Sequence, residues 1–549
     1  MTATPDLGPT ADRRAPGAPG TAGRHDDRRS PPAVGADPEQ VRAAVADLCS
    51  PAQTVQVRET HISWLFLTPD RAFKLKKPIV LDFLDYGTAR RRQAMCHAEI
   101  RLNARLAPDV YLGVRGIVDA GDRLRIADED DRGTIDYLVE MRRYDESHTL
   151  SAAVARHQIS AGRLTQLAQL LAGFHRVCPS RTDRAGAVTV RHETQKNLGG
   201  LADQLTACDD REQTLALGRF LQAFTAANAD MLDGRARAGA IREAHGDLRA
   251  EHVILEPVVS VVDCVEFDRD LRTVDVADDL AFLVMDLCAL GAEPAARALI
   301  AEYRRAGGDC GSDELVWFFA VHRALVRAKV ELVRAAQLSG DDAGHNAAAS
   351  RLLDVAYRCA WRARGRRVIV VCGVPASGKS HLAQAISASA GLPMISSDVV
   401  RKQLAGVAAT DHAPAPAYRP IFSQRTYREL GRRAAQAVAD GSGALVDATF
   451  RRAADRAAFT EGFADAASLT FVQCVAPDAV LAQRATARDH DPARISDATA
   501  DIVASERHRF QALDEVGAHE HLLLRTDRPT AAMIADLLAL LDVRLTRRS

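Results

Sequence analysis

One stretch, GVPASGKS at positions 373–380, has the residue types and spacing of a phosphate-binding loop. It matches G-x-x-x-x-G-K-[ST] at every fixed position, follows the apolar run VIVVC and precedes HLAQAISASA, a segment with helical spacing. Glycines let backbone N–H groups turn towards phosphate oxygens, the lysine adds positive charge, and the last hydroxyl suits Mg²⁺. The alternative is an ordinary glycine-rich turn before a helix. The pattern favours binding of ATP or GTP by Gly373, Val374, Pro375, Ala376, Ser377, Gly378, Lys379 and Ser380.

A second stretch, HGDLRAEHVIL at positions 245–255, follows the logic H-x-D-x-x-x-x-N of a kinase catalytic loop. In that logic the Asp accepts the proton of the acceptor hydroxyl and the Asn binds Mg²⁺. Here Asp247 is in place, but His252 stands where the Asn would be. Imidazole suits Mg²⁺ less well than an amide oxygen does. Several alternatives stay open. The site could use Mn²⁺, or Glu251 could replace the missing Asn as a metal ligand. The loop could also bind a ligand without catalysing a reaction, or the His-Gly-Asp triplet could be a chance occurrence.

The elements that position this second loop predict a small lobe of strands followed by a helical region. Strand candidates at 61–68 and 71–80 are joined by the turn dipeptide Pro69-Asp70, and a helix runs from Thr88 to before Pro108. Further strands follow up to position 144, and from 151 to 240 apolar residues recur at three- and four-residue spacing. Short β-like runs flank the loop, helices resume, and 337–347 is predicted to be a loop before a helix that ends near 362.

From Arg367 the order becomes strand, phosphate-binding loop, helix, then strands and helices in alternation. The strand candidates are RRVIVVCG, PMISSD, GALVDATF, SLTFVQCVA and HLLLRT. Such alternation predicts a parallel sheet covered on both faces. The boundaries that follow are a disordered tail at 1–38, a first domain at 39–335, a linker or helix at 336–366, and a second domain at 367–549.

Composition indicates a multidomain protein of the cytoplasm. The chain has 549 residues, 47% of them apolar, and a formal net charge of −1, so nothing favours a polyanionic partner such as nucleic acid. Its ten cysteines lack C-x-x-C or zinc spacing, which indicates reduced thiols. No apolar run reaches the roughly 18 residues of a membrane span, and the first residues lack the apolar segment of a signal peptide. We therefore expect a cytoplasmic location and no membrane partner.

The HGDL text followed by a β-run resembles the aminoglycoside phosphotransferase and choline kinase-like family, whose typical text is HGDLxxxNIL. VVDCVEF and DVADDLA resemble later motifs of that family, and AFKLKK resembles its strand lysine. The resemblance covers about residues 45–335 and implies a bilobal protein-kinase-like fold. It implies that Asp247 is the base and that Asp263 and His252 are the metal ligands. It also implies that Lys74, or alternatively Lys76, anchors the nucleotide phosphates and that Glu99 pairs with that lysine. Asp279 matches the family's later motif.

Three segments after the phosphate-binding loop resemble small P-loop kinases of the zeta-toxin and polynucleotide-kinase type. SSDVVRK, VDATFRRAADR and AQRATARDHDPAR carry this resemblance, which covers 367 to about 530. It implies that Asp398 deprotonates the acceptor, and that Asp447 lies near Mg²⁺ or substrate. It also implies substrate or lid roles for Arg401, Arg456, Arg484, Arg488 and Arg494. The alternatives are that Asp398 only caps a helix and that the lid arginines form a solvated face.

The whole order resembles actinobacterial fusions of an aminoglycoside phosphotransferase-like domain with an ATP-binding domain. The expected fold is thus α+β followed by α/β, a bilobal kinase-like domain and then a P-loop NTPase domain with a parallel sheet. We expect an ATP-dependent phosphotransferase that uses Mg²⁺, or Mn²⁺ at the N-terminal site, and acts on hydroxyl groups of small molecules at one or two sites. One alternative is an N-terminal pseudokinase that senses a metabolite and regulates the P-loop kinase. A polynucleotide 5′-end kinase ranks lowest, because the aromatic residues of the second domain are scattered.

Overall fold

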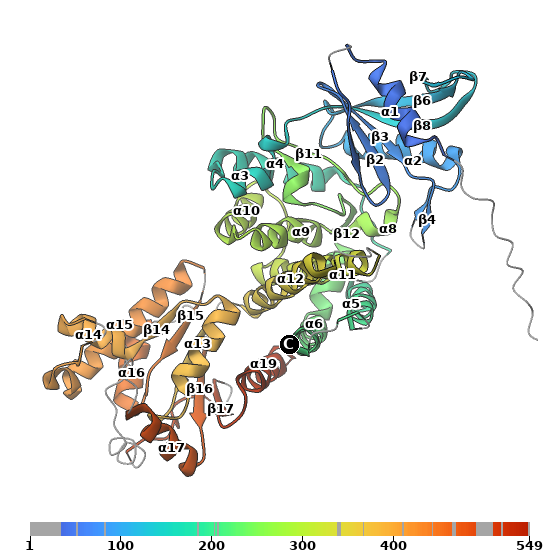
Figure 1. Cartoon of the computed structure of the whole chain (residues 1–549). Coiled ribbons are helices and arrows are strands. Elements are labelled where there is room, and N and C mark those ends of the chain that lie inside the picture. Colours follow the sequence, from blue (N-terminus) through green and yellow to red (C-terminus); the bar gives the residue numbers. More distant parts are fainter. Residues whose placement is uncertain are drawn as a thin grey trace, which may run out of the picture.

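The computed structural model consists of a β-rich lobe, a helical lobe and a C-terminal α/β domain (Figure 1). No helix among the residues it describes is both long and apolar enough to span a membrane. The described residues are 35–50, 53–81, 84–183, 186–202, 204–205, 208–337, 342–365, 367–408, 411–441, 443–463, 468–489, 509–517 and 520–546.

The β-rich lobe is an antiparallel sheet of six strands in the order β1-β2-β3-β8-β6-β7. Residues alternate between its faces, so Phe73 and Leu75 of β3 pack towards helix α1, whereas Lys74 and Lys76 point to the face that carries α2. The bounds are α1 Pro38–Ala46, β1 Gln56–Glu59, β2 Ser63–Leu67, β3 Arg71–Lys76, β4 Val80–Leu81, β5 Leu84–Asp85, α2 Ala89–Asn103, β6 Tyr111–Asp119, β7 Leu124–Asp128 and β8 Thr134–Arg142.

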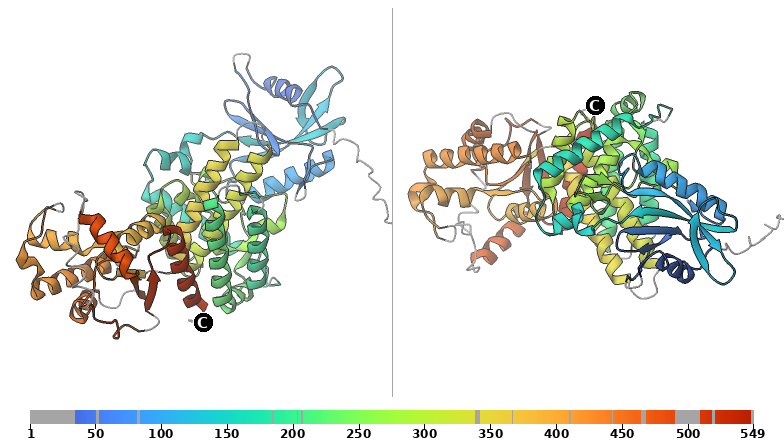
Figure 2. Two further views of the ribbon diagram at one scale, coloured as in Figure 1. Left: turned by 60° about the horizontal axis from the view of Figure 1, so that its bottom comes forward. Right: turned by 90° about the horizontal axis from the view of Figure 1, so that it is seen from above.

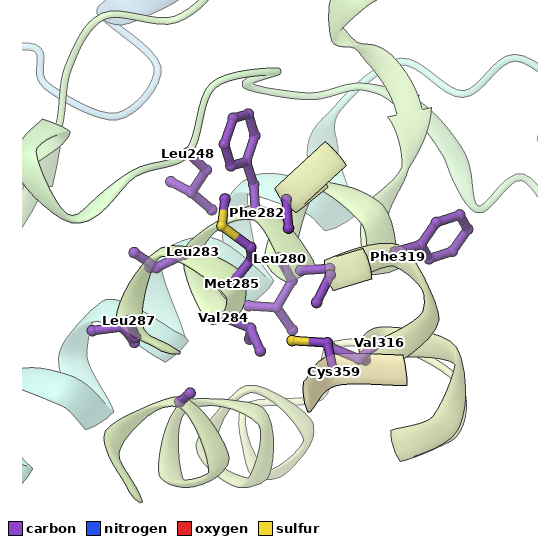
Figure 3. Close-up of a cluster of buried hydrophobic side chains, with 14 of the residues drawn as sticks. Leu248, Leu280, Phe282, Leu283, Val284, Met285, Leu287, Val316, Phe319 and Cys359 are labelled. Carbon is purple, nitrogen blue, oxygen red and sulfur yellow. The ribbon is translucent and has the colours of Figure 1, made fainter. Parts of the chain in front are cut away.

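The helical lobe surrounds α9, whose side chains are buried along most of its length. Figure 3 shows α9 residues packed with Leu248 of the HGDL segment, Val316 and Cys359. The bounds are η1 Glu146–His148, α3 Leu150–Ala155, α4 Ala161–Val177, α5 Gly186–Ala202, α6 Cys208–Ala227, α7 Ala229–Arg237, β9 Ile241–Glu243, η2 Ala250–His252, β10 Val253–Ile254, β11 Ser260–Val261, α8 Arg269–Arg272, β12 Thr273–Asp275, α9 Val276–Ala289, α10 Glu293–Arg305, α11 Asp313–Gln337 and α12 Asp342–Ala363.

Two sequence predictions about this half of the chain need correction. Helix α12 begins at Asp342, so the predicted loop at 337–347 is wrong from that residue onward. Residues of α12 such as Ala356 and Cys359 are buried in the core of the helical lobe, because α12 carries an apolar face that the periodicity already contained. The predicted tail at 1–38 lies outside the described residues up to position 34. Ala36, however, is buried, and its N–H donates to Asp136 Oδ2 at 3.1 Å.

The C-terminal domain is a parallel five-stranded sheet in the order β14-β15-β13-β16-β17. Apolar clusters cover both faces: one joins the sheet to α13 and α19, and the other joins it to α14, α15 and α16. The expected α/β fold is thereby confirmed. The bounds are β13 Arg367–Cys372, α13 Lys379–Ala390, β14 Met394–Ser396, α14 Ser397–Ala405, η3 Ala415–Tyr418, α15 Pro420–Ala439, β15 Ala444–Asp447, α16 Ala453–Phe463, β16 Ser468–Val475, α17 Asp478–Asp489, β17 His521–Arg525 and α19 Thr530–Thr546.

The C-terminal domain is docked on the helical lobe rather than tethered by an open linker. Helix α19 lies beside α6, and α12 leads from the helical lobe into β13 (Figures 1 and 2). Ala216 of α6 and Trp361 of α12 belong to the same apolar cluster as one face of the parallel sheet. A buried ion pair between Arg364 and Asp542 of α19 adds a polar contact to this junction.

Candidate functional site

The P-loop follows β13 and leads directly into α13, as the sequence context predicts. Gly373 adopts a φ of +139°, and a Cβ there would lie 2.7 Å from the carbonyl oxygen of Cys474, so only glycine fits. Gly378 and Ala376 also have positive φ values, +84° and +66°. Lys379 and Ser380 are the first two residues of α13. The N-terminus of a helix with inward-turned backbone N–H groups is suited to bind phosphate.

Two carboxylates lie at the same edge of the sheet as the P-loop. Asp447 is the last residue of β15, where it pairs in register with Val371 of β13 and with Ser396 of β14. Asp398 follows in the first turn of α14. Because the strands are parallel, their carboxyl ends bring Asp447 and Asp398 to the edge from which the P-loop departs.

The residues at this edge fit a magnesium ion held with nucleotide phosphates. Asp447 is buried, and its Oδ1 has no hydrogen-bond partner within the described part of the chain. A buried carboxylate oxygen without a partner is costly unless a cation or donor completes it. With the Ser380 hydroxyl, it would supply the oxygen ligands that Mg²⁺ prefers, and the ion would neutralise phosphate charge there.

Of the predicted lid arginines, the structure places Arg484 beside the P-loop. Its Nη2 donates to the Thr526 carbonyl at 2.6 Å, and its Nη1 lies 3.1 Å from where a Cβ on Gly378 would be. Thr526 in turn donates its hydroxyl to the Ser377 carbonyl at 2.5 Å. Thr526 was not found from the sequence, because no motif marks the residue after β17. Arg488 lies near the end of α17 and its side chain is not described, and Arg494 lies outside the described residues.

The two other arginines predicted to bind substrate, Arg401 and Arg456, are engaged by the protein. Arg401 Nη1 donates to the Ala417 carbonyl at 2.6 Å, and its guanidinium lies 5.0 Å from the ring centre of Tyr418. A role of Arg401 towards substrate stays a prediction. Arg456 is 2% exposed, and it pairs with Glu515 while donating to the backbone carbonyls of Phe450, Gln511 and Ala512. Every guanidinium nitrogen of Arg456 is used inside the fold, so a role of Arg456 towards an anionic substrate would need these contacts to change and stays a prediction.

In the first domain, a cleft of about 2020 Å³ between the two lobes is lined by Lys74, Asp247, His252 and Asp263. Lys74 Nζ lies 2.8 Å from Glu99 Oε1 and 2.8 Å from Asp263 Oδ1, so the predicted lysine–glutamate pair is formed. Burial by itself would raise the pKa of Asp263, but Lys74 and its other cationic neighbours hold that pKa well below its usual range. Asp263 is therefore ionised at neutral pH.

Lys76 lies behind Lys74 and does not line the cleft. Its Nζ contacts Glu99 Oε2 at 2.7 Å and pairs with Glu266, whose Oε1 also accepts the Tyr86 hydroxyl at 2.6 Å. Burial and Glu266 together raise the pKa of Tyr86 far above its usual range, so this hydroxyl remains a donor. Glu99 thus contacts both lysines, and of the two only Lys74 lines the cleft.

The HGDL loop is held by a buried carboxylate beneath it. Asp279 accepts the backbone N–H of His245 at 3.1 Å and that of Gly246 at 2.8 Å, and it accepts His175 Nε2 at 3.0 Å. Gly246 has a φ of +85°. Asp279 and His175 are completely or almost completely buried. They position the loop that carries Asp247, in line with the motif match at Asp279.

His252 lies between the two carboxylates that would hold a metal. Its Nδ1 is 3.7 Å from Asp247 Oδ2 and its Nε2 is 3.6 Å from Asp263 Oδ2. The Nδ1 also lies 2.9 Å from the Asp247 carbonyl oxygen, which can only accept, so Nδ1 carries the hydrogen. The Nε2 lies 3.1 Å from Arg249 Nη2, which can only donate, so the lone pair of Nε2 accepts this hydrogen bond.

Arg249 is the residue of this loop that sequence reasoning missed. Its Nε lies 3.1 Å from the Asp247 carboxylate, and another nitrogen pairs with Glu251. The "RAEH" text held the signal, since an arginine always carries positive charge and stood two residues from the proposed base.

These contacts do not fit a magnesium ion at the N-terminal site. Neither nitrogen of His252 offers a lone pair in this arrangement, so metal binding by His252 would need these contacts to change and stays a prediction. Oδ1 of Asp263 is engaged by Lys74. Over the described residues, no group of three or more His, Cys, Asp or Glu side chains is arranged to hold a metal ion.

Comparison with known proteins finds one family match in the N-terminal part of the chain and another in the C-terminal part. Residues 64–309 match the phosphotransferase enzyme family, and residues 368–513 match an AAA domain family. An uncharacterized protein of Mycobacterium tuberculosis H37Rv, Rv2004c, is 33% identical over 465 residues, which cover 82% of this chain and 89% of that protein. A protein of Mycobacterium bovis, Mb2027c, matches equally. This chain belongs to their family.

Solved structures resemble one half of the chain or the other. The choline/ethanolamine kinase family protein from Mesorhizobium loti is 14% identical, covers 58% of this chain and 98% of its own, and gives a TM-score of 0.35. A gluconokinase from Sinorhizobium meliloti is 22% identical, covers 34% of this chain and 95% of its own, and gives a TM-score of 0.24. With its kinase-like phosphotransferase domain and its P-loop domain, the chain is a phosphotransferase enzyme.

Proposed function

We propose that this enzyme transfers a phosphoryl group from ATP to a hydroxyl group of a small molecule, and that the transfer takes place at the P-loop. The observation that carries this proposal is the meeting of the P-loop, Asp447 and Asp398 at one edge of the parallel sheet. The loop and Lys379 would bind the phosphates, and Ser380 and Asp447 would hold Mg²⁺. Asp398 would then accept the proton of the acceptor hydroxyl, while Arg484 neutralises charge on the phosphoryl group.

The first domain is proposed as a ligand-binding domain that regulates this transfer. The contacts of His252 and Arg249 support this role, because they leave the loop without a metal ligand where Asn would stand. A second active site is the other candidate, and it is favoured by the Lys74–Glu99 pair. For that site to work, Arg249 would have to leave Asp247 when substrate binds.

A polynucleotide acceptor is not favoured by the side chains of the second domain. Phe450 and Phe459 are fully buried in the core, where they cannot stack with bases. Tyr418 is exposed, but its ring lies under the guanidinium of Arg401. A small hydroxylated acceptor is therefore preferred.

Phosphoryl transfer from ATP to a pooled set of sugars, amino sugars, nucleosides and aminoglycosides tests the proposal. The enzyme should label at least one acceptor, and Asp398→Asn should lower turnover by at least about 100-fold while ATP still binds, because a general base contributes about 10²–10⁴-fold. Exposed Asp514→Asn, which lines neither the cleft nor the cavity between the domains, is the matched control and should leave turnover unchanged. Labelling that survives in Asp398→Asn would remove this residue from the chemistry.

A further inference from the structure

A cavity of about 290 Å³ lies between the helical lobe and the C-terminal domain, and it shares no lining residue with the P-loop or with the cleft of the first domain. One wall is a single face of α10, where Arg297, Ile300 and Arg304 recur at helical spacing. The other wall includes Arg367 and Ile369, at the start of β13. The P-loop begins after the other end of β13, a strand of six residues that spans about 20 Å. A ligand in this cavity would not overlap with ATP.

A buried donor at the cavity wall lacks an acceptor. Trp361 lines the cavity and is 5% exposed, and its indole Nε1 has no hydrogen-bond partner within the described part of the chain. A buried N–H without an acceptor is costly, and most such groups in folded proteins are satisfied. The indole Nε1 can only donate, so the missing group is an acceptor.

The charged lining of the cavity consists of four arginines and three acidic residues, Asp313, Glu314 and Asp440, and Asp313 is paired with Arg304. Arg297 Nη2 and Arg362 Nη2 lie 2.7 Å and 2.8 Å from the same oxygen, Glu293 Oε1. One carboxylate thus serves two guanidinium groups. Burial lowers the pKa of Arg362, and although Glu293 opposes this shift, the nearby Arg297 adds to it. A second anion would reduce the repulsion between these two guanidinium groups.

Both domains contribute to these contacts. Arg297 of α10 donates to the carbonyl oxygen of Gly441, which follows α15. Arg362 of α12 donates to the carbonyl oxygen of Gly391, which follows α13, at 3.3 Å. Apolar surface from Ile300, Trp317, Ile369 and Leu392 completes the lining. An anionic ligand with an apolar body would accept from the indole, add a second negative charge beside the two arginines that share Glu293, and cover this surface.

We infer that this cavity between the domains is a binding site for a small organic anion, a carboxylate or phosphate carried on an apolar or aromatic body. Occupation joins α10 and α12 of the helical lobe to β13, the strand that carries the P-loop. The site therefore connects the first domain to the proposed site of phosphoryl transfer without including any P-loop residue.

Tryptophan fluorescence tests this site directly, because two of the three tryptophans of the chain, Trp317 and Trp361, line the cavity. The full chain carrying Trp64→Phe is titrated with benzoate and with phenyl phosphate, and with benzyl alcohol and inorganic phosphate as comparisons. The aryl anions should change the emission saturably. Benzyl alcohol lacks the charge and inorganic phosphate lacks the apolar body, so both should bind at least about tenfold more weakly. A preference for benzoate or for phenyl phosphate identifies the anionic group.

Variants assign the signal to the cavity. Arg297→Gln should weaken binding at least about tenfold, and Trp361→Phe, which keeps a ring but removes the donor, should weaken it several-fold. Arg305→Gln is the matched control, since Arg305 is an exposed residue of α10 that does not line the cavity. Lys379→Ala should leave binding unchanged. The inference is overturned by the absence of a saturable response to both aryl anions, by binding that persists unchanged in Arg297→Gln, or by binding that disappears in Lys379→Ala.

Discussion

Replacing Arg364 should weaken the junction between the two domains more than any surface substitution near it. The side chains of Arg364 and Asp542 are 2% and 8% exposed, with Nη2 at 2.7 Å and Nε at 2.8 Å from Asp542 Oδ1. The guanidinium also lies 4.4 Å from the ring centre of Phe220. Arg364→Met leaves the Asp542 carboxylate buried without its partner, which costs about 3–5 kcal/mol of unfolding free energy.

The double variant Arg364→Met/Asp542→Leu should behave differently. Burial lowers the pKa of Arg364 and raises that of Asp542 in spite of their contact, so for both groups loss of water outweighs their attraction. An apolar pair of similar volume avoids that loss. We expect the double variant to be within about 1 kcal/mol of the native chain or more stable than it.

Urea unfolding followed by the emission of Trp361, whose ring centre lies 5.7 Å from the Arg364 guanidinium, measures these differences. Arg358→Met, on the exposed side of α12, is the control and should cost less than about 0.5 kcal/mol. A loss below about 1 kcal/mol in Arg364→Met would refute the reasoning. So would a double variant as unstable as the single one.

Three further predictions address the two sites and their support. Gly373→Ala should abolish ATP binding at the P-loop, measured by calorimetry, because its Cβ would lie 2.7 Å from the Cys474 carbonyl oxygen; unchanged affinity would contradict this. Burial lowers the pKa of His322 from 6.5 to about 4. The neutral ring is thus favoured by folding, and about 3 kcal/mol of stability present above pH 6.5 should be lost as the pH falls to 4. His322→Gln should flatten that part of the pH–stability curve, and an unchanged slope would refute the assignment. Asp279→Asn places an amide N–H₂ donor against N–H groups that themselves donate to Asp279. Urea unfolding should show a loss of about 2–4 kcal/mol of unfolding free energy, and no loss would contradict the buried network.

Local patterns predicted the parts of the fold that depend on neighbouring residues. The P-loop text specified a turn between a strand and a helix, and the strand alternation placed Lys74 and Lys76 on one face of β3. The alternation of strands and helices after Arg367 specified the parallel sheet, and with it the edge at which Asp447 and Asp398 meet. The domain limits derived from the same pattern stay a prediction.

Contacts between distant residues were beyond these patterns. Lys76 meets Glu266 across 190 positions of the sequence, and Arg456 meets Glu515 across 59. Only the packing of the lobes and of the segment after α17 brings such residues together, so a motif could not tell that Arg456 is used inside the fold. The periodicity of α12 was visible, but its partners in the helical lobe were not.

The most direct test of the account compares Lys379→Ala with Asp247→Asn for transfer of the γ-phosphoryl group of ATP to an acceptor found in the screen. Lys379→Ala should remove transfer, because the P-loop then lacks its phosphate-binding cation. Asp247→Asn should leave the rate at saturating ATP and acceptor within about threefold of the native enzyme. Transfer that survives Lys379→Ala but is lost in Asp247→Asn would contradict the account and assign the chemistry to the first domain.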